Sequence, residues 1–208
     1  MKNHNIPFLE LTADAKKIHC FFPLLQHGFG MEIQAGCSVR SLLCEKFGLN
    51  PDYVEERIRT VFLDGKAVDD LDRSVVRDGA TLALSAAMPG LVGSTFRRGS
   101  YLASFRSTIT CPQEQASPLY GGKGTVILKL FNLTVTELGP AFLKQGIRIR
   151  KNELEEFLKL MPEDFRTGCK SVIKDGTETA ADELPRMTWS EQETSVLLTV
   201  HLYETSCP

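Results

Sequence analysis

The chain has 208 residues, a length that can hold one large domain or two small ones. Hydrophobic residues make up 42%, charged residues 24% and the formal net charge is −2, so no basic excess favours nucleic-acid binding. Apolar runs stay far below the roughly 18 residues of a membrane span, and "MKNHNIPFLELTADAKK" lacks the apolar core of a secretory signal, so we expect a cytoplasmic protein without nucleic-acid or membrane partners.

The first predicted elements along the chain form a hairpin. Residues 17–25, "KIHCFFPLL", and 28–35, "GFGMEIQA", are rich in aromatic and aliphatic residues and are separated by a short turn. A helix is predicted over 39–47, because Ser38 is a suitable N-cap, apolar residues recur near helical spacing, and Gly48 can end the helix.

Two more strands are predicted around Asp64-Gly65, a dipeptide that tolerates the positive φ angles of a tight hairpin turn. Pro51, before them, suits the first turn of a short helix. Another strand is expected at 80–88, after the turn residues Asp78-Gly79. The predicted order is strand, strand, helix, strand, short strand, strand. Its expected core contains Val39, Leu42, Leu43, Phe62, Leu82 and Leu84.

This order, with "IQAGCSVRSLLCEKFG" and "VFLDGKAVDDLDRSVVRDGATLALSAAMPG", resembles the MoaD/ThiS family of small sulfur carriers in molybdopterin and thiamine biosynthesis. The markers are Gly36 before the helix, the "LDGKAVDD" hairpin and "VRDGATLAL" leading into the last strand. The resemblance covers about residues 17–90 and implies a ubiquitin-like β-grasp fold. We therefore expect an α+β protein with an N-terminal β-grasp domain at 1–92.

The resemblance also implies the chemistry of a free glycine tail. In the family, an ATP-dependent partner adenylates a C-terminal glycine carboxylate, which a sulfur donor converts to a thiocarboxylate. Here the corresponding stretch contains Gly90 and Gly93, but the chain continues to Pro208, so the uncut chain has no such carboxylate. Gly121-Gly122 would become a terminus if a protease cut before Lys123, although "YGGKG" is also typical of a flexible turn before a strand.

The remaining sequence predicts an arm and a second region. Residues 93–123 are rich in Gly, Ser, Thr and Pro, which favours an arm or linker. Their aromatic residues indicate that this arm is ordered and packs on another part of the protein. Residues 124–208 predict a C-terminal α+β region of no recognised family, with strands at 125–135 and 194–204. No internal repeat is evident, so no second β-grasp is expected.

The helix predicted at 152–161 has the strongest local pattern of this region. Leu154, Phe157, Leu158 and Met161 form an apolar stripe at helical spacing. Asn152 and Glu155 have the spacing of a capping box, and Pro162 can end the helix.

Cysteines and histidines predict neither disulfides nor a metal site. The six cysteines form no Cys-x-x-Cys pair, the four histidines lack metal-ligand spacing, and His19 and Cys20 would point to opposite faces of a strand. The helix N-terminus is expected to lower the pKa of Cys37 somewhat. The Asp69, Asp70 and Asp72 cluster and the Arg97-Arg98 pair are expected to be solvated. We assign no catalytic, cofactor-binding or metal residue.

Three functions remain open at this stage. The first is a non-catalytic protein-binding module that has kept the ubiquitin-like surface, because an open sheet and its edge strand can dock another chain. The second is a sulfur carrier that needs proteolytic processing and meets an adenylating-enzyme-like partner. The third is an enzyme with a site between the two halves. Fold resemblance alone does not decide among them.

Overall fold

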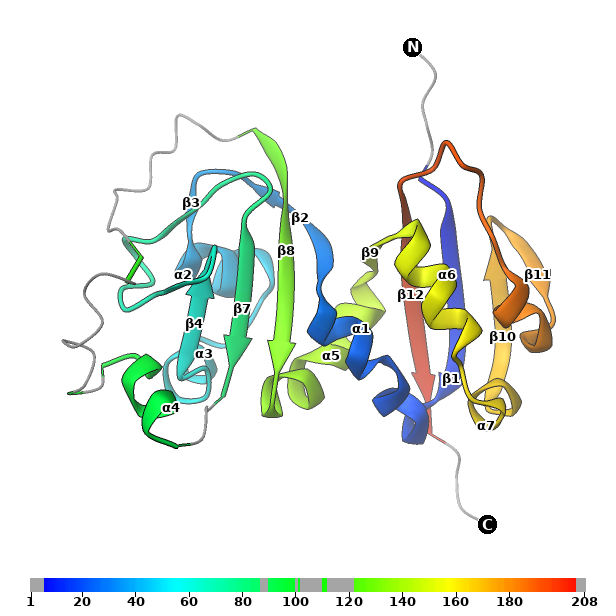
Figure 1. Cartoon of the computed structure of the whole chain (residues 1–208), viewed down its shortest axis with the longest axis horizontal. Helices are drawn as coiled ribbons and strands as arrows, with labels where there is room; N and C mark the ends of the chain where they lie inside the picture. Colours follow the sequence, from blue (N-terminus) through cyan, green and yellow to red (C-terminus); the bar gives the residue numbers. More distant parts are fainter. Residues whose placement is uncertain (1–5, 87–89, 100, 102–109, 112–121, 205–208) are drawn as a thin grey trace. The chain divides into compact units, whose positions relative to one another are not determined.

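The computed structural model describes residues 6–86, 90–99, 101, 110–111 and 122–204. The chain forms two compact units, and both are mixed α+β (Figure 1). Unit 1 comprises Met1–Phe29 with Thr136–Pro208, and unit 2 comprises Gly30–Val135. The bounds of these units differ from those of the expected segments, 1–92, 93–123 and 124–208.

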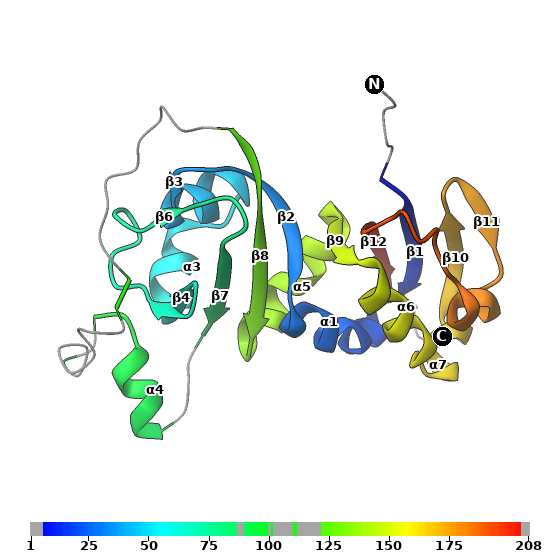
Figure 2. The same ribbon diagram turned by 45° about the horizontal axis from the view of Figure 1, so that its top comes forward.

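Unit 2 contains, in chain order, β2 (Phe29–Gln34), β3 (Cys37–Ser38), α2 (Val39–Ser41), the π-helical turn η2 (Leu42–Lys46), α3 (Pro51–Glu56), β4 (Thr60–Leu63), β5 (Lys66–Ala67), β6 (Val75–Val76), β7 (Thr81–Ser85), α4 (Gly90–Phe96) and β8 (Lys123–Phe131). Its sheet has the order β2-β8-β7-β4-β5. Strands β7 and β8 are parallel, whereas β4 is antiparallel to both β7 and β5. Strands β3 and β6 form a separate antiparallel pair (Figure 2).

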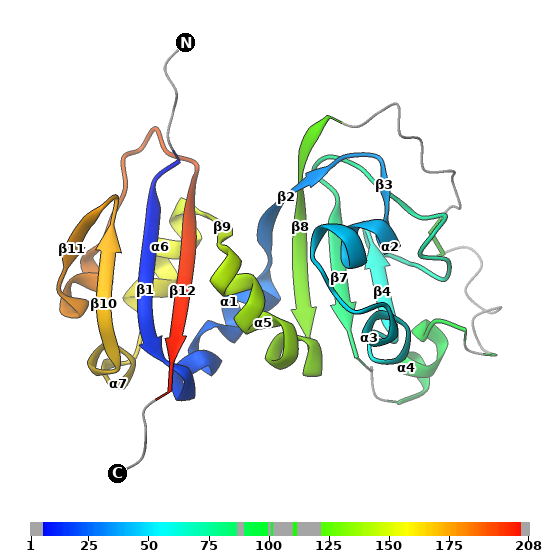
Figure 3. The same ribbon diagram turned by 180° about the vertical axis from the view of Figure 1, so that it is seen from behind.

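Helices cover one face of the sheet of unit 2. Seen from behind, α2 and α3 lie in front of β4 and β7 (Figure 3). The predicted core is fully buried at Val39, Leu42, Leu43, Leu82 and Leu84. The sixth predicted core residue, Phe62, is only partly buried and belongs to the opposite side of β4. We call that opposite side the open face of unit 2, and it is formed by Phe62, Thr81, Ala83, Ile127, Lys129 and Phe131.

Unit 1 contains β1 (Phe8–Asp14), the 3-10 helix η1 (Ala15–Phe21), α1 (Phe22–His27), most of α5 (Leu133–Gln145), β9 (Ile147–Arg150), α6 (Lys151–Lys159), α7 (Glu163–Thr167), β10 (Cys169–Lys174), β11 (Thr177–Thr179), the 3-10 helix η5 (Ala181–Arg186) and β12 (Ser195–Tyr203). Its sheet has the order β11-β10-β1-β12-β9. Strands β1 and β12 are parallel, and the other neighbouring pairs are antiparallel. Phe21 is fully buried, and its ring centroid lies 5.7 Å from that of Phe157 in α6 and 5.3 Å from that of Phe165 in α7.

Residues 17–25 do not form the predicted strand of a hairpin, because they lie in η1 and α1. Pro23 stands in the first turn of α1, a position that tolerates its missing N–H. Phe21, Leu24 and Leu25 are buried at i, i+3 and i+4, the spacing of one helical face. A short apolar run is compatible with either structure, and here the helical spacing and the proline decide.

The predicted helix of the C-terminal region is confirmed as α6, with Leu154 and Leu158 fully buried. Its expected capping box does not form, because the N-cap is Arg150 and makes no side-chain cap. The Glu155 carboxylate instead accepts the backbone N–H of Trp189 at 2.9 Å. The acidic side chain thus anchors a distant loop rather than the first turn of its own helix.

The strand predicted at 125–135 is present as β8 but ends at Phe131. Asn132 has a φ of 55°, in the left-handed region that asparagine tolerates, and α5 begins directly after it. The strand predicted at 194–204 is confirmed as β12.

The order of elements repeats along the chain although no sequence repeat is evident. The first half contributes β1, α1, β2, α2, β4, β5 and β7, and the second half contributes β8, α5, β9, α6, β10, β11 and β12. Each half has a glycine with positive φ between its first helix and its second strand, Gly28 and Gly146. Strand β1 joins the sheet that the second half builds, and β8 joins the sheet that the first half builds. The two strands take different places, because β1 lies between β10 and β12 whereas β8 lies between β2 and β7.

Candidate functional site

The segment after β7 is the candidate site, because a carrier of the resembled family has its glycine tail there. Strand β7 ends at Ser85, and α4 begins at Gly90. Gly90 is exposed with a φ of 78°, whereas Gly93 is buried within α4. The strand predicted at 80–88 thus ends earlier than expected, and residues 87–89 lie outside the described residues. Of the arm predicted at 93–123, residues 93–96 belong to α4, and most of the rest lies outside the described residues.

Hydrogen bonds tie the end of β7 to the residues that follow β8. The Asn132 side-chain amide donates to the Ser85 hydroxyl at 2.9 Å, and the Thr134 hydroxyl donates to the Leu84 carbonyl at 3.0 Å. Ser85 and Thr134 are both buried. The last residues of β7 are therefore held by side chains from elsewhere in unit 2.

An aromatic contact packs α4 against the open face. The rings of Phe96 and Phe62 are tilted, with centroids 5.1 Å apart. This geometry is typical of a favourable aromatic pair. It also explains why Phe62 is partly buried although it does not point into the predicted core.

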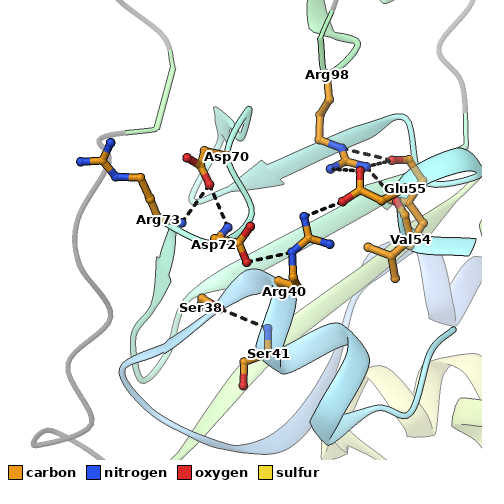
Figure 4. Close-up of polar contacts among 10 residues, drawn as sticks. Ser38, Arg40, Ser41, Val54, Glu55, Asp70, Asp72, Arg73 and Arg98 are labelled. Atoms are coloured by element: carbon orange, nitrogen blue, oxygen red, sulfur yellow. Dashed lines mark hydrogen bonds and ion pairs between the residues drawn. The ribbon is translucent and has the colours of Figure 1, made fainter. Parts of the chain in front are cut away.

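Arg98 fixes the end of the same segment (Figure 4). Its guanidinium donates to the Val54 carbonyl at 2.8 Å and to the Ile58 carbonyl at 2.8 and 3.2 Å. Its backbone N–H donates to the Arg59 carbonyl at 2.8 Å. The side chain is only 9% exposed, so our expectation of a solvated Arg98 is wrong. Its neighbour Arg97 is exposed, as expected.

These contacts use the polar end of α3. The last carbonyls of a helix lack partners within the helix and carry a partial negative charge, so a buried cation beside them is stabilising. The sequence alone does not indicate that Arg98 binds these carbonyls, because two adjacent arginines in a polar stretch are more often solvated. Pairing Arg98 with the end of α3 requires residues more than 40 positions apart to meet.

Glu55 joins Arg98 to a second arginine. Arg98 Nη1 lies 3.5 Å from one Glu55 oxygen, and Arg40 Nη2 lies 2.5 Å from the other. Arg40 Nε also donates to Asp72 at 2.8 Å. The hydrogen bond from Arg40 is the main reason why the pKa of Glu55 lies below its usual value, while burial lowers the pKa of Arg98. We call these four side chains, Arg40, Glu55, Asp72 and Arg98, the arginine cluster.

Hydrogen bonds and an ion pair hold the acidic loop around Asp70 and Asp72. The Asp70 carboxylate accepts the backbone N–H groups of Asp72 and Arg73 at 2.9 and 3.1 Å, and Asp72 pairs with Arg40. Within the described residues, no three His, Cys, Asp or Glu side chains are grouped so that they could hold a metal ion.

The second glycine pair lies at the start of β8. Gly122 is exposed, and its carbonyl accepts the Ala35 N–H at 3.0 Å, while Gly121 lies outside the described residues. A Cβ added to Gly90 or Gly122 would meet nothing within 4 Å. Close packing therefore explains neither glycine, and only the positive φ of Gly90 favours that residue type.

The described thiols are free, namely Cys20, Cys37, Cys44, Cys111 and Cys169. The expectation of a lowered pKa at Cys37 is wrong, because burial raises it. Burial also raises the pKa of Cys169, to about 11. His19 and Cys20 do not point to opposite faces of a strand, since they follow each other in η1 with Nε2 and Sγ 3.8 Å apart.

No protein-family model, curated protein or solved structure matches the chain. Among the described residues, no helix combines the length and apolar character needed to cross a membrane.

Proposed function

We propose that unit 2 is a ubiquitin-like β-grasp domain that acts as a non-catalytic protein-binding module, with β8 as its missing strand. From β2 onward, the elements follow the expected order of helix, strand, short strand and strand. The hairpin partner that β2 lacks at 17–25 has a substitute in β8, which lies next to β2 in the sheet. The family resemblance of the sequence and this strand arrangement support the same assignment.

The observation that carries the non-catalytic reading is the attachment of residues 90–98. A carrier tail must thread into the active site of its partner, which requires a free and flexible end. Here Phe96 packs on β4 and Arg98 binds the carbonyls at the end of α3. Releasing the segment would break the Phe62–Phe96 contact and leave the Val54 and Ile58 carbonyls without their donor, which costs free energy.

The proposed binding surface is the part of the open face that β7 and β8 form, beside Phe62, whose ring packs against Phe96 of α4. In β8, the fully buried Val126, Leu128 and Leu130 alternate with partly exposed Ile127 and Lys129 on this face. Pairing of β7 with β8 places the small residues Thr81 and Ala83 beside them. Apolar groups around one cation on a firm sheet form a surface that can dock another protein.

The proposed partner is therefore a protein, and the compartment is the cytoplasm. Free thiols at all described cysteines favour a reducing compartment. If the carrier alternative holds, the partner is an adenylating-enzyme-like protein, and processing must expose Gly90, Gly93, Gly121 or Gly122. Among the residues that the structure describes, no convergent set of catalytic groups supports the enzyme alternative.

Intact-mass measurement of the protein from its native cell separates the module from the carrier. We expect the mass of a chain that extends beyond Gly122. A species ending at one of the four candidate glycines would contradict the module and favour the carrier.

A second experiment tests the attachment itself. Arg98→Met should remove the bonds to α3 and accelerate amide exchange over residues 91–99, while Arg97→Met, the exposed neighbour, serves as the matched control. Equal exchange in both variants at the wild-type rate would contradict the role given to Arg98. Exchange at the rate of an unstructured peptide in the wild type would restore the segment as a candidate tail.

Charge reversal on the open face tests the binding surface. Partners that co-purify with the wild type should be lost from Lys129→Glu and retained by Lys66→Glu, an exposed lysine of β5 on the other side of the sheet. Retention of every partner by both variants would move the binding surface elsewhere.

A further inference from the structure

A small cavity in unit 1 lies between the start of β1, the β10–β11 turn and the loop before β12. Its volume is about 380 Å³, at the small end of the range for ligand sites. Ile6, Pro7 and Phe8 contribute apolar lining. Lys174, Trp189 and Glu193 also line the cavity.

The walls of this cavity are fixed by hydrogen bonds that do not involve a ligand. Asp175 accepts the Phe8 N–H at 2.8 Å, and the Leu197 N–H donates to the Pro7 carbonyl at 2.9 Å. Glu155 of α6 accepts the Trp189 N–H at 2.9 Å. The site is therefore largely formed before any ligand arrives, which lowers the entropic cost of binding.

Two opposite charges line the cavity without pairing with each other. Lys174 Nζ donates to the Thr188 carbonyl at 2.6 Å and lies 5.0 Å from the centre of the Trp189 ring, which leaves further ammonium protons available. Within the described part of the chain, the Glu193 carboxylate has no side-chain partner. The backbone N–H of Glu193 donates to the Ser190 carbonyl at 3.0 Å. Trp189 is 7% exposed, and its indole N–H has no acceptor among the described residues. The lining of the cavity thus carries a charge of each sign.

From this arrangement we infer that the cavity binds a free amino acid with an apolar side chain. The ligand carboxylate would meet Lys174, its ammonium group would meet Glu193, and its side chain would lie against Ile6, Pro7 and Phe8. A phosphorylated ligand fits less well, because the carboxylates of Glu193 and Asp175 line the same small space. A purely cationic ligand would meet the Lys174 ammonium group. This inference is independent of the function proposed for unit 2.

Trp189 provides a direct readout, because it is the single tryptophan of the chain. L-leucine, L-methionine and L-valine are titrated at millimolar concentrations into the full-length protein while its fluorescence is recorded. We expect a saturable change with at least one of them. The N-acetyl and amide derivatives of that amino acid should bind about tenfold more weakly or worse, because each lacks one charge.

Two variants connect the signal to the cavity. Glu193→Gln and Lys174→Met should each weaken binding by about tenfold, whereas Glu191→Gln, an exposed carboxylate outside the cavity, should leave it unchanged. A urea unfolding curve for each variant checks that it is folded. If Lys174→Met does not fold, Glu193→Gln with the N-acetyl derivative still tests the ammonium contact. No saturable signal, or equal binding of the blocked derivatives, would overturn the inference.

Discussion

Each unit has a hairpin turn with an aspartate that binds the first residue of the neighbouring strand. That strand comes from a different part of the chain in each unit. In unit 2, Asp64 donates its N–H to the Thr81 carbonyl at 2.9 Å and accepts the Thr81 N–H at 2.8 Å. In unit 1, Asp175 makes the same two bonds to Phe8, at 3.0 and 2.8 Å. Thr81 begins β7, and Phe8 begins β1.

The two aspartates also share their backbone conformation. Asp64 and Asp175 have φ angles of 50° and 49°, and the glycines after them have 77° and 84°. The place next to the hairpin is taken by β7 in unit 2, which follows a short distance along the chain. In unit 1 it is taken by β1, from the beginning of the chain. The same turn thus binds a strand that is near in the sequence or one that is far away. The turn motif alone therefore does not identify the strand that it binds.

The largest expected effect comes from removing the remote strand. Deletion of residues 1–14 takes away β1, which pairs with both β10 and β12 and buries Leu9 and Leu11 completely. Unit 1 should lose its folded structure, while unit 2, a continuous stretch of chain, should keep its own. Amide exchange would show unprotected β12 and protected β7. Deletion of residues 1–5, which stops short of β1, is the control, and a protected β12 after the longer deletion would break the comparison.

Matched core truncations should give a smaller effect in each unit. Leu43→Ala in unit 2 and Leu11→Ala in unit 1 remove fully buried side chains, and each should lower the free energy of unfolding by about 2 to 5 kcal/mol. Urea denaturation measures the loss, and amide exchange shows which unit carries it. A change below about 0.5 kcal/mol at Leu43 would mean that its side chain lies at the surface.

The two turn aspartates should be energetically similar. Asp64→Ala and Asp175→Ala each remove one side-chain acceptor and place alanine at positive φ, so each should cost about 1 kcal/mol or somewhat more. The asparagine variants keep an acceptor oxygen and tolerate the left-handed conformation, and they should stay close to the wild type. Thermal unfolding of the four variants measures these changes in stability. A large cost at only one aspartate would show that the two turns are not equivalent.

The smallest expected effect concerns the thiols. Burial raises the pKa of Cys169 in unit 1 to about 11 from an ordinary value of 9.0. The folded state therefore favours the protonated thiol, so the resulting stability is present below pH 9 and is lost as the pH rises toward 11. Alkylation of folded protein, followed by peptide mapping, should find Cys169 slow to react at pH 9 and fast in urea.

Under denaturing, non-reducing conditions, all six cysteines should react. Two or more protected thiols would indicate a disulfide and would contradict the cytoplasmic assignment. Rapid reaction of Cys169 in the folded protein at pH 9 would contradict its burial.

Local patterns in the sequence were sufficient for elements whose residues interact with near neighbours. The Asp64-Gly65 turn, the α6 stripe of Leu154 and Leu158, and the buried alternation of Leu82 and Leu84 depend on backbone preference and side-chain spacing alone. These properties are visible in a window of a few residues. The same window could not distinguish strand from helix at 17–25, where the apolar run was continuous.

Tertiary structure decided what depends on residues far apart in the chain. The pairing of β1 with β10 and β12, the place of β8 beside β7, and the burial of Arg98 at the end of α3 each join distant segments. Burial likewise decides that the Cys37 pKa is raised rather than lowered. The Glu155 carboxylate binds the backbone of Trp189, 34 residues away, instead of capping its own helix. Pairing and burial are properties of the folded neighbourhood, because the free energy of a strand edge or a charge depends on what covers it.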